Sequence, residues 1–413
     1  MLSRKRNPMI NLENHPYFTP FTDEKSGVVS YVLTEKVAPM QRHLYFTNPS
    51  ITKDGKYLWI LCANPPAQYF TIAVISLDPK NPFIRHFPYA SPNLIPRASD
   101  PGITPEGDGV YYSQGNTVYK LDVEGNLTVV LTVGNDILKR RYLGNLFTHA
   151  SVSCDNRYLA MDMHIADHTY MSVADLKSGD IRLLCKLASG GYNHAQFSPT
   201  KPDLILLDQD ASWDLHTGEY FPINNRMWLI NTDATRFEPV LPSMFYGRDG
   251  TEMAHDYWSA DGWVCGSDYL NGAFECNIDT GEFNLVWKRP VCHSHTSRTR
   301  QMFVGDQTPY NWSEVPCQLL FYDRETNKEI PIFAEMPMPR YSRMPYHHDP
   351  HPQFCVNDTV IVSTTTVMDG NVDVALTPVA PLLEACRERG EIVVPRTGKP
   401  RKGSTWRTEI KQF

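Results

Sequence analysis

A short unit of sequence recurs seven times along the 413-residue chain, and it constrains the fold more than any other feature. Each copy has a few extended residues, an apolar residue, a Ser, Thr or Cys, a turn containing Asp, Asn, Gly or Pro, and then an apolar strand. The copies occupy residues 48–55, 100–107, 149–156, 194–201, 255–262, 293–300 and 351–358. Four short antiparallel strands in ~40–50 residues form one blade of a β-propeller. The sequence therefore predicts an all-β chain folded as a seven-bladed β-propeller.

The seven units favour a single domain. We expect residues 1–413 to form one propeller, with short tails at about 1–16 and 385–413. A propeller must close its ring, often with strands from both termini, and residues 26–34 and 372–378 are available for this. A pair of β-sandwiches is the competing architecture, but sandwiches give no seven-fold self-similarity.

One aligned position of the units is dominated by histidine. It holds Asn48, Asp100, His149, His194, His255, His293 and His351, whereas the whole chain has only 14 histidines. The first strand of each blade lines the central channel, so equivalent positions converge on one axis. Residues two positions further on share that face and add His295. A single histidine on a strand is usually a structural residue held by hydrogen bonds. Such a structural role does not account well for five histidines that converge on one axis. A ring of imidazoles suits metal binding, proton transfer near neutral pH, or contacts to polar ligands.

The densest part of this ring comes from the last two blades. It comprises His293, His295, His347, His348, Asp349 and His351. Imidazole with carboxylate suits Mn²⁺, Zn²⁺, Fe²⁺ or Ni²⁺. We expect no cysteine at this position, which argues against a structural zinc site. The sequence therefore predicts a bound divalent ion.

Charge and cysteine usage exclude other classes. The net charge is −7, with acidic and basic residues interspersed, so the chain lacks the basic stripe of a nucleic-acid-binding protein. No stretch approaches the ~18 apolar residues of a membrane span, so we expect no membrane partner. The N-terminus is basic but has no apolar run of a signal peptide behind it. The nine scattered cysteines indicate reduced thiols in a cytoplasmic protein.

Five stretches of sequence carry a family resemblance. They are residues 193–200, 225–233, 254–262, 293–306 and the hairpin that begins at residue 351. In these stretches the chain resembles the bacterial oligogalacturonate lyases, which are cytoplasmic seven-bladed propellers of pectin degradation. The resemblance covers about residues 26–380 and is strong from about 190 to 358.

This resemblance implies a site. Lyases of that family hold manganese through histidines of the last two blades and a glutamine, use a histidine as base, and are assisted by an arginine. Carried over by motif, the base is His255, the arginine is Arg226, and the metal histidines are His293 and His351. The family's third metal histidine corresponds to Asp349 in this chain.

Two further departures concern the metal and the substrate. The family's glutamine position holds Tyr346, and His348 or His347 is available as a fourth donor. An insertion around residues 214–222 is expected to lengthen a loop near the channel. The expected substrate-binding residues are His149, His194, Asp100 and His295.

The implied activity is β-elimination of a uronic-acid oligosaccharide, which gives an unsaturated uronide. A divalent ion, most simply Mn²⁺, would neutralise the carboxylate beside the C5 proton, with Arg226 as a fixed bidentate donor. His255, on blade five and set apart from the last two blades, would take the proton. A lyase for another uronide linkage, such as a glucuronide, and a non-catalytic propeller that binds sugar or protein remain open, because propellers host many functions.

Overall fold

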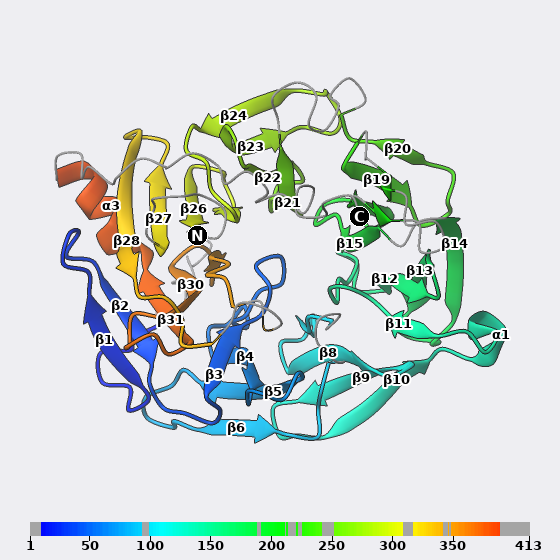
Figure 1. Ribbon diagram of the computed structural model, residues 1–413, viewed down its shortest axis with the longest axis horizontal. Coiled ribbons are helices and arrows are strands. Elements are labelled where there is room, and N and C mark those ends of the chain that lie inside the picture. The colour runs from blue at the N-terminus through cyan, green and yellow to red at the C-terminus, as the bar shows by residue number, and fades with distance from the viewer. Residues whose placement is uncertain are drawn as a thin grey trace, which may run out of the picture.

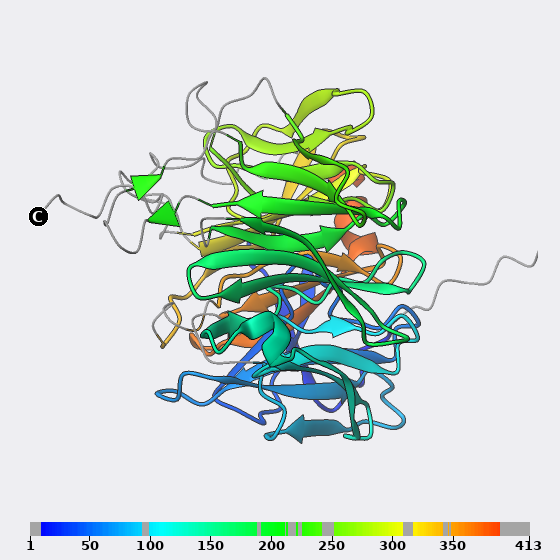
Figure 2. The same ribbon diagram turned by 90° about the vertical axis from the view of Figure 1, so that its right-hand side faces the viewer.

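Seven antiparallel sheets stand in a ring around a central channel, which confirms the predicted all-β, seven-bladed propeller (Figure 1). The computed structural model describes residues 10–92, 99–187, 191–210, 225–241, 252–308, 317–341, 346 and 348–388, together with the backbone of 212–213 and 220–221. Viewed edge-on, the strands cross the disc from one mouth of the channel to the other (Figure 2).

The first three blades are four-stranded sheets ordered along the chain. Blade one has β3 (Met40–His43), β4 (Tyr57–Ala63), β5 (Phe70–Ser76) and β6 (Ile84–Phe87). Blade two has β7 (Gly102–Ile103), β8 (Gly109–Gln114), β9 (Thr117–Asp122) and β10 (Leu127–Thr132). Blade three has β11 (Leu143–Asn145), β12 (Tyr158–Ile165), β13 (His168–Asp175) and β14 (Ile181–Leu187).

The next three blades repeat this order. Blade four has β15 (Tyr192–Phe197), β16 (Leu204–Gln209), β19 (Met227–Asn231) and β20 (Phe237–Pro239), and the short pair β17 (Ser212–Trp213) and β18 (Tyr220–Phe221) lies between β16 and β19 in the sequence. Blade five has β21 (Met253–Trp258), β22 (Val264–Asp268), β23 (Gly272–Cys276) and β24 (Phe283–Trp287). Blade six has β25 (Ser294–Thr296), β26 (Met302–Gln307), β27 (Cys317–Asp323) and β28 (Lys328–Met336).

Strands from both ends of the chain build blade seven. Its five strands are β29 (Gln353–Cys355), β30 (Val360–Thr365), β31 (Asp373–Pro378), β2 (Val29–Leu33) and β1 (Phe18–Thr22). In the pairing of β2 with β31, Tyr31 lies opposite Leu376, and the hydroxyls of Ser30 and Thr377 are 2.7 Å apart. Both termini therefore close the ring, as predicted.

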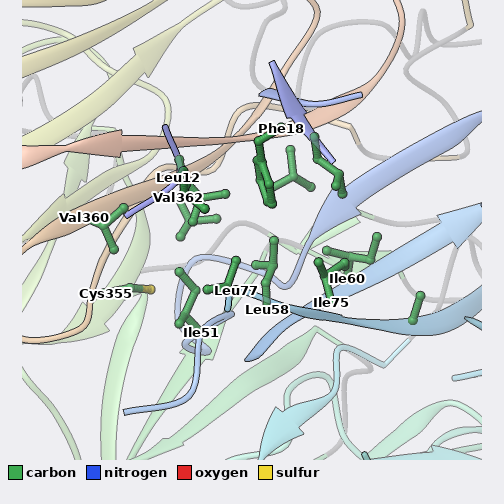
Figure 3. Close-up of a cluster of buried hydrophobic side chains, with 14 of the residues drawn as sticks. Leu12, Phe18, Ile51, Leu58, Ile60, Ile75, Leu77, Cys355, Val360 and Val362 are labelled. Carbon is green, nitrogen blue, oxygen red and sulfur yellow. The ribbon is translucent and has the colours of Figure 1, made fainter. Parts of the chain in front are cut away.

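Apolar side chains fill the spaces between blades. Figure 3 shows the cluster where blade seven meets blade one, in which Leu58 and Ile60 of β4 face Val360 and Val362 of β30. Leu12, within the expected N-terminal tail, is buried in the same cluster.

The helices whose bounds lie within the described residues are short and peripheral. They are α1 (Asn135–Leu138) and α3 (Val379–Glu388), and α3 packs against β28 with Val379, Leu382 and Cys386 buried. The C-terminal tail, expected from about residue 385, thus begins inside α3, and residues 389–413 lie outside the described part of the chain. In the described residues, no helix has the length and apolar character needed to cross a membrane.

The channel has two distinct mouths. We call the end at which each first strand turns into the second the hairpin mouth, and the end at which each first strand begins the entry mouth. Four of the five ring histidines stand near the beginning of their first strands, and His149, which follows β11, lies beside His194. The ring histidines therefore belong to the entry half of the channel.

Blade one sends a loop into the channel. His43 and Ile51 are eight positions apart in the sequence, whereas their β4 partners Ile60 and Leu58 are only two positions apart. The extra residues, 44–49, form what we call the channel loop, which reaches from β3 into the middle of the ring (Figure 1). Tyr45 and Phe46 in this loop are both buried.

Candidate functional site

Three ring histidines lie in unusual backbone conformations. His194, His255 and His351 have positive φ angles of 56°, 54° and 44°. At His255 the pairing of β21 with β22 shifts register between Ala254 and Tyr257, which is a β-bulge. A left-handed conformation costs a non-glycine residue about 1–3 kcal/mol and persists where the surroundings enforce it. Such bulges redirect a side chain, and here they mark the channel-lining positions.

The ring histidines form two groups. The ring centroids of His255 and His293 are 4.0 Å apart, and those of His293 and His351 are also 4.0 Å apart. On the other side, Nε2 of His149 lies 2.7 Å from Nδ1 of His194. The convergence on the axis is therefore present, but His255 does not stand apart from the last two blades. It lies directly beside His293.

The channel loop fills the space between these groups. Tyr45 stacks on His149 with centroids 4.4 Å apart, and it also contacts His194 at 5.7 Å. Phe46 lies 6.2 Å from His255 and 5.6 Å from His293. Burial raises the pKa of the Tyr45 phenol well above 10.0, so the phenol stays neutral at physiological pH.

The partners of His293 and His255 fix their tautomers. Nδ1 of His293 lies 3.0 Å from Oδ2 of the fully buried Asp306, so this nitrogen carries the proton and donates to the carboxylate. Nδ1 of His255 lies 2.6 Å from the carbonyl oxygen of Cys292. Because a carbonyl only accepts hydrogen bonds, Nδ1 of His255 also carries a proton. In the neutral imidazole the lone pair of each histidine is then on Nε2.

The two neighbouring imidazoles differ in their affinity for protons. Burial lowers the pKa of His255 well below 6.5, and the positive charges of His293 and Arg226 lower it further. Burial would also lower the pKa of His293, but the Asp306 carboxylate outweighs burial and raises it well above 6.5. In the metal-free protein, His255 is therefore the neutral partner and His293 the protonated one.

Arg226, which directly precedes β19, is held by three carboxylates. Its Nε lies 2.7 Å from Oδ2 of Asp256, its Nη2 lies 3.0 Å from Oδ2 of Asp208, and its Nη1 pairs with Asp210. Burial and the charge of Asp256 raise the pKa of Asp208 well above its usual value. Because Asp256 directly follows His255, Arg226 is tied to the bulge that presents this histidine.

The other predicted metal ligands lie nearby in a separate small cavity. Asp349 and His348 are both buried and line a cavity of about 20 Å³. Nε2 of His348 lies 3.1 Å from the carbonyl oxygen of Tyr341. Tyr346, at the family's glutamine position, is buried. His347 lies outside the described residues, as does most of the insertion expected at 214–222, of which only the backbone of 220–221 is described.

Among the described residues, one set of three potential ligands from His, Cys, Asp and Glu has all its ligand atoms within 4.8 Å of one another. The set is His255, Cys292 and His293. The expectation that no cysteine stands at the site was therefore wrong, because Cys292 precedes β25 and its side chain reaches the histidines.

The predicted substrate-binding residues do not share one surface. Asp100 accepts hydrogen bonds from Arg42 and from the backbone N–H of Tyr45, so it anchors the channel loop. His295 stacks on Tyr257 with centroids 5.1 Å apart and lines a cavity of about 610 Å³ at the hairpin mouth. The described lining of that cavity includes none of the five ring histidines, so His295 and the ring histidines face different halves of the channel.

Several residues of the site were not singled out from the sequence. Asp306 and Asp256 have simple signals, since Asp306 closes a resembling stretch and Asp256 follows His255. Cys292 directly precedes His293. Tyr45 and Phe46 come before the first repeat unit, residues 48–55, so the alignment of repeats offered no signal for them.

Comparison with known proteins supports the architecture. No protein-family model and no curated protein matches the chain in sequence. Among solved structures, an oligogalacturonate lyase in complex with manganese superposes with a TM-score of 0.70 at 17% identity, over 87% of this chain and 96% of that one. An oligogalacturonate lyase from Vibrio parahaemolyticus gives 0.69 at 16% identity, over 88% of this chain and 96% of that one. The chain shares the fold of these two lyases, in agreement with the resemblance seen in the sequence.

Proposed function

We propose that this protein is a metal-dependent lyase that cleaves uronic-acid oligosaccharides, with oligogalacturonates as the first candidates, by β-elimination. The observation that carries the proposal is the contact of His255, His293 and His351 at the entry half of the channel, with two ring-to-ring distances of 4.0 Å. The shared fold of two oligogalacturonate lyases, one of them a manganese complex, supports it.

The residues present fit a divalent ion. A metal-binding histidine usually donates its other ring N–H to a carboxylate, and His293 does so to Asp306. His293 and His351 would hold the ion, with Asp349 and His348 as the remaining proposed ligands. The chemistry supplied by such an ion, most simply Mn²⁺, is neutralisation of the uronate carboxylate, which makes the neighbouring C5 proton more acidic.

His255 is the proposed base. Its Nδ1 donates to the carbonyl of Cys292, which leaves the lone pair on Nε2. The lowered pKa keeps the ring neutral near pH 7, so that it is ready to accept a proton. The bulge at this position fixes the direction in which the ring points.

Arg226 supports the reaction chiefly by positioning. Its three ion pairs hold Asp256 and therefore the backbone next to His255. In this arrangement the guanidinium also contributes a fixed positive charge to the channel that receives an anionic sugar.

His149, His194, Asp100 and His295 remain proposed substrate contacts. The pair of the buried His149 and the half-buried His194 faces His293 and His351 across Tyr45, which is where a sugar hydroxyl would find polar partners.

A lyase for a different uronide linkage, such as a glucuronide, is the second candidate. It is favoured by Asp349 and Tyr346, which replace the family's metal histidine and glutamine, and by the aromatic channel loop that shapes the centre of the ring. We further propose a cytoplasmic location, because all nine cysteines are free.

The test is a panel of purified oligosaccharides containing galacturonate, glucuronate or other uronates. The unsaturated uronide product absorbs ultraviolet light, so its formation is followed directly, with and without a chelator. Product from oligogalacturonates that disappears with chelator and returns with Mn²⁺ would support the first candidate, and product from glucuronides alone would support the second. If no uronide yields unsaturated product under any metal condition, the lyase proposal is wrong and a binding propeller is the better reading.

A further inference from the structure

Cys292 brings a thiol to the proposed active site. Its Sγ lies 3.9 Å from Nε2 of His293, and the ligand atoms of Cys292, His293 and His255 all fall within 4.8 Å of one another. Cys292 and His293 are buried, and His255 is half-buried. One sulfur atom and two imidazole nitrogens therefore lie close to one another.

The distance between Sγ of Cys292 and Nε2 of His293 is close to that between two ligand atoms on one tetrahedral ion. With Zn–S of about 2.3 Å and Zn–N of about 2.0–2.1 Å, a sulfur and a nitrogen on the same ion stand roughly 3.5 Å apart. The observed 3.9 Å requires a shift of a few tenths of an ångström. Rotation of the Cys292 side chain about one bond can supply this movement.

The surroundings already orient both imidazoles. The Nδ1–H of His293 is bound to Asp306 and that of His255 to the carbonyl of Cys292, so Nε2 is the nitrogen left to act as a ligand in each ring. Such partners behind the ligands fix the tautomer and raise the basicity of a metal-binding histidine.

The donor set selects the kind of ion. Thiolate is a soft ligand that favours zinc-class ions, whereas Mn²⁺ prefers carboxylate, carbonyl and water oxygens. We propose that His255, Cys292 and His293 bind a thiophilic divalent ion of the zinc class, and that this ion takes the proposed base as a ligand. The Cys292 thiol and Nε2 of the protonated His293 each release a proton to solvent when they become ligands.

The consequence for activity rests on the proposed function. A thiophilic ion at this site would share His293 with the proposed catalytic ion and would occupy the Nε2 lone pair of His255. Zinc would then inhibit an enzyme that a harder ion such as Mn²⁺ activates. Ion binding itself does not depend on the lyase proposal and is tested without substrate.

The experiment uses Co²⁺ as a spectroscopic probe for zinc in the purified full-length protein. Thiolate bound to Co²⁺ gives a near-ultraviolet charge-transfer band, which excess Zn²⁺ should remove. Cys292→Ser should lose the band, and Cys317→Ser, which changes a neighbouring thiol outside the ligand set, should keep it. Loss of a partner behind a ligand typically weakens metal binding about 10–100-fold. Asp306→Asn should weaken Zn²⁺ binding by that factor, and Cys292→Ser by at least as much.

Two outcomes would overturn the proposal. One is the absence of the thiolate band in wild type under saturating Co²⁺, which would mean that Cys292 only shares a hydrogen bond with His293. The other is a band of wild-type strength in Cys292→Ser. Because neither readout involves turnover, an inactive wild type would refute the lyase proposal while leaving this result interpretable.

Discussion

The imidazole of His255 lies with its ring centroid 4.0 Å from that of His293, although the two residues open different blades. The contact places the proposed base beside the proposed metal ligand, while opposite pKa shifts keep one ring neutral and the other protonated in the metal-free protein. In the proposed mechanism this pair of residues would serve both proton transfer and ion binding, and variants can separate the two roles.

Replacing the base should abolish turnover but not folding. A positioned general base contributes about 10²–10⁴ to a rate, so His255→Ala should lower the formation of unsaturated uronide by at least that factor. Melting temperature and Mn²⁺ content should stay close to wild type, because His293 and His351 are unchanged. His149→Ala serves as a comparison on the other side of Tyr45. Near-wild-type turnover in His255→Ala would move the base to His194 or His149.

Removing the metal histidine should empty the site. His293→Ala should reduce bound divalent metal to background in elemental analysis of the purified protein. Asp306→Asn keeps the size of the side chain but weakens the acceptor for Nδ1–H, and it should reduce Mn²⁺ affinity about 10–100-fold. Equal metal content in wild type and His293→Ala would show that His293 is not a ligand of the ion.

Shortening the arginine should affect both stability and rate. Removing one partner of a buried ion pair costs about 3–5 kcal/mol, so Arg226→Met should lower the free energy of unfolding by that amount in urea titrations. Arg226→Lys keeps the positive charge but loses the three guanidinium nitrogens that pair with the three carboxylates. The variant should therefore fold, while its turnover falls. Arg300→Lys, at a two-carboxylate site away from the channel histidines, is the matched control and should leave turnover unchanged. A positioning role for Arg226 predicts a fall in kcat with little change in KM, whereas direct substrate binding predicts mainly a rise in KM.

Acid should destabilise the propeller below about pH 6.5. Burial lowers the pKa of His43 to about 3 and that of His295 to about 4, from 6.5 in the unfolded chain. Between these values the unfolded state binds protons that the folded state does not, so stability falls as the pH falls, by up to about 1.4 kcal/mol per pH unit for each histidine. Denaturant titrations from pH 7.5 to pH 4.5 measure this slope. His295→Gln should make the slope shallower, and an unchanged slope would show that His295 is protonated in the folded protein.

The blades were predictable because the sequence pattern that specifies each hairpin lies within a few neighbouring residues. Each hairpin needs only alternating apolar residues and a turn, and seven copies of that pattern leave few architectures. Ring closure was predictable for the same reason, since residues 26–34 and 372–378 are extended segments left over when the blades are counted. The channel loop was not, because its residues 44–47 come before the first repeat unit and were not part of the alignment.

The site was predictable in its histidines and in Arg226, but not in the residues that surround them. Consecutive residues of a strand point to opposite faces, so Cys292 would be expected to point away from His293. The regular strand β25 begins only at Ser294, however, and the irregular backbone before it lets both side chains reach the same point. The cage around Arg226 combines carboxylates from different strands, and no spacing in the sequence indicates that they meet.

Blade seven joins β1 and β2 from the start of the chain to β29, β30 and β31 from its end. During synthesis on the ribosome, the N-terminal strands emerge first and must wait for about 340 residues before their partner β31 appears. Until then the apolar surface shown in Figure 3 lacks its C-terminal members, among them Val360 and Val362, and is open to chaperones or to aggregation. Premature termination anywhere before residue 378 would therefore produce not a smaller propeller but an unclosed chain that quality control should remove.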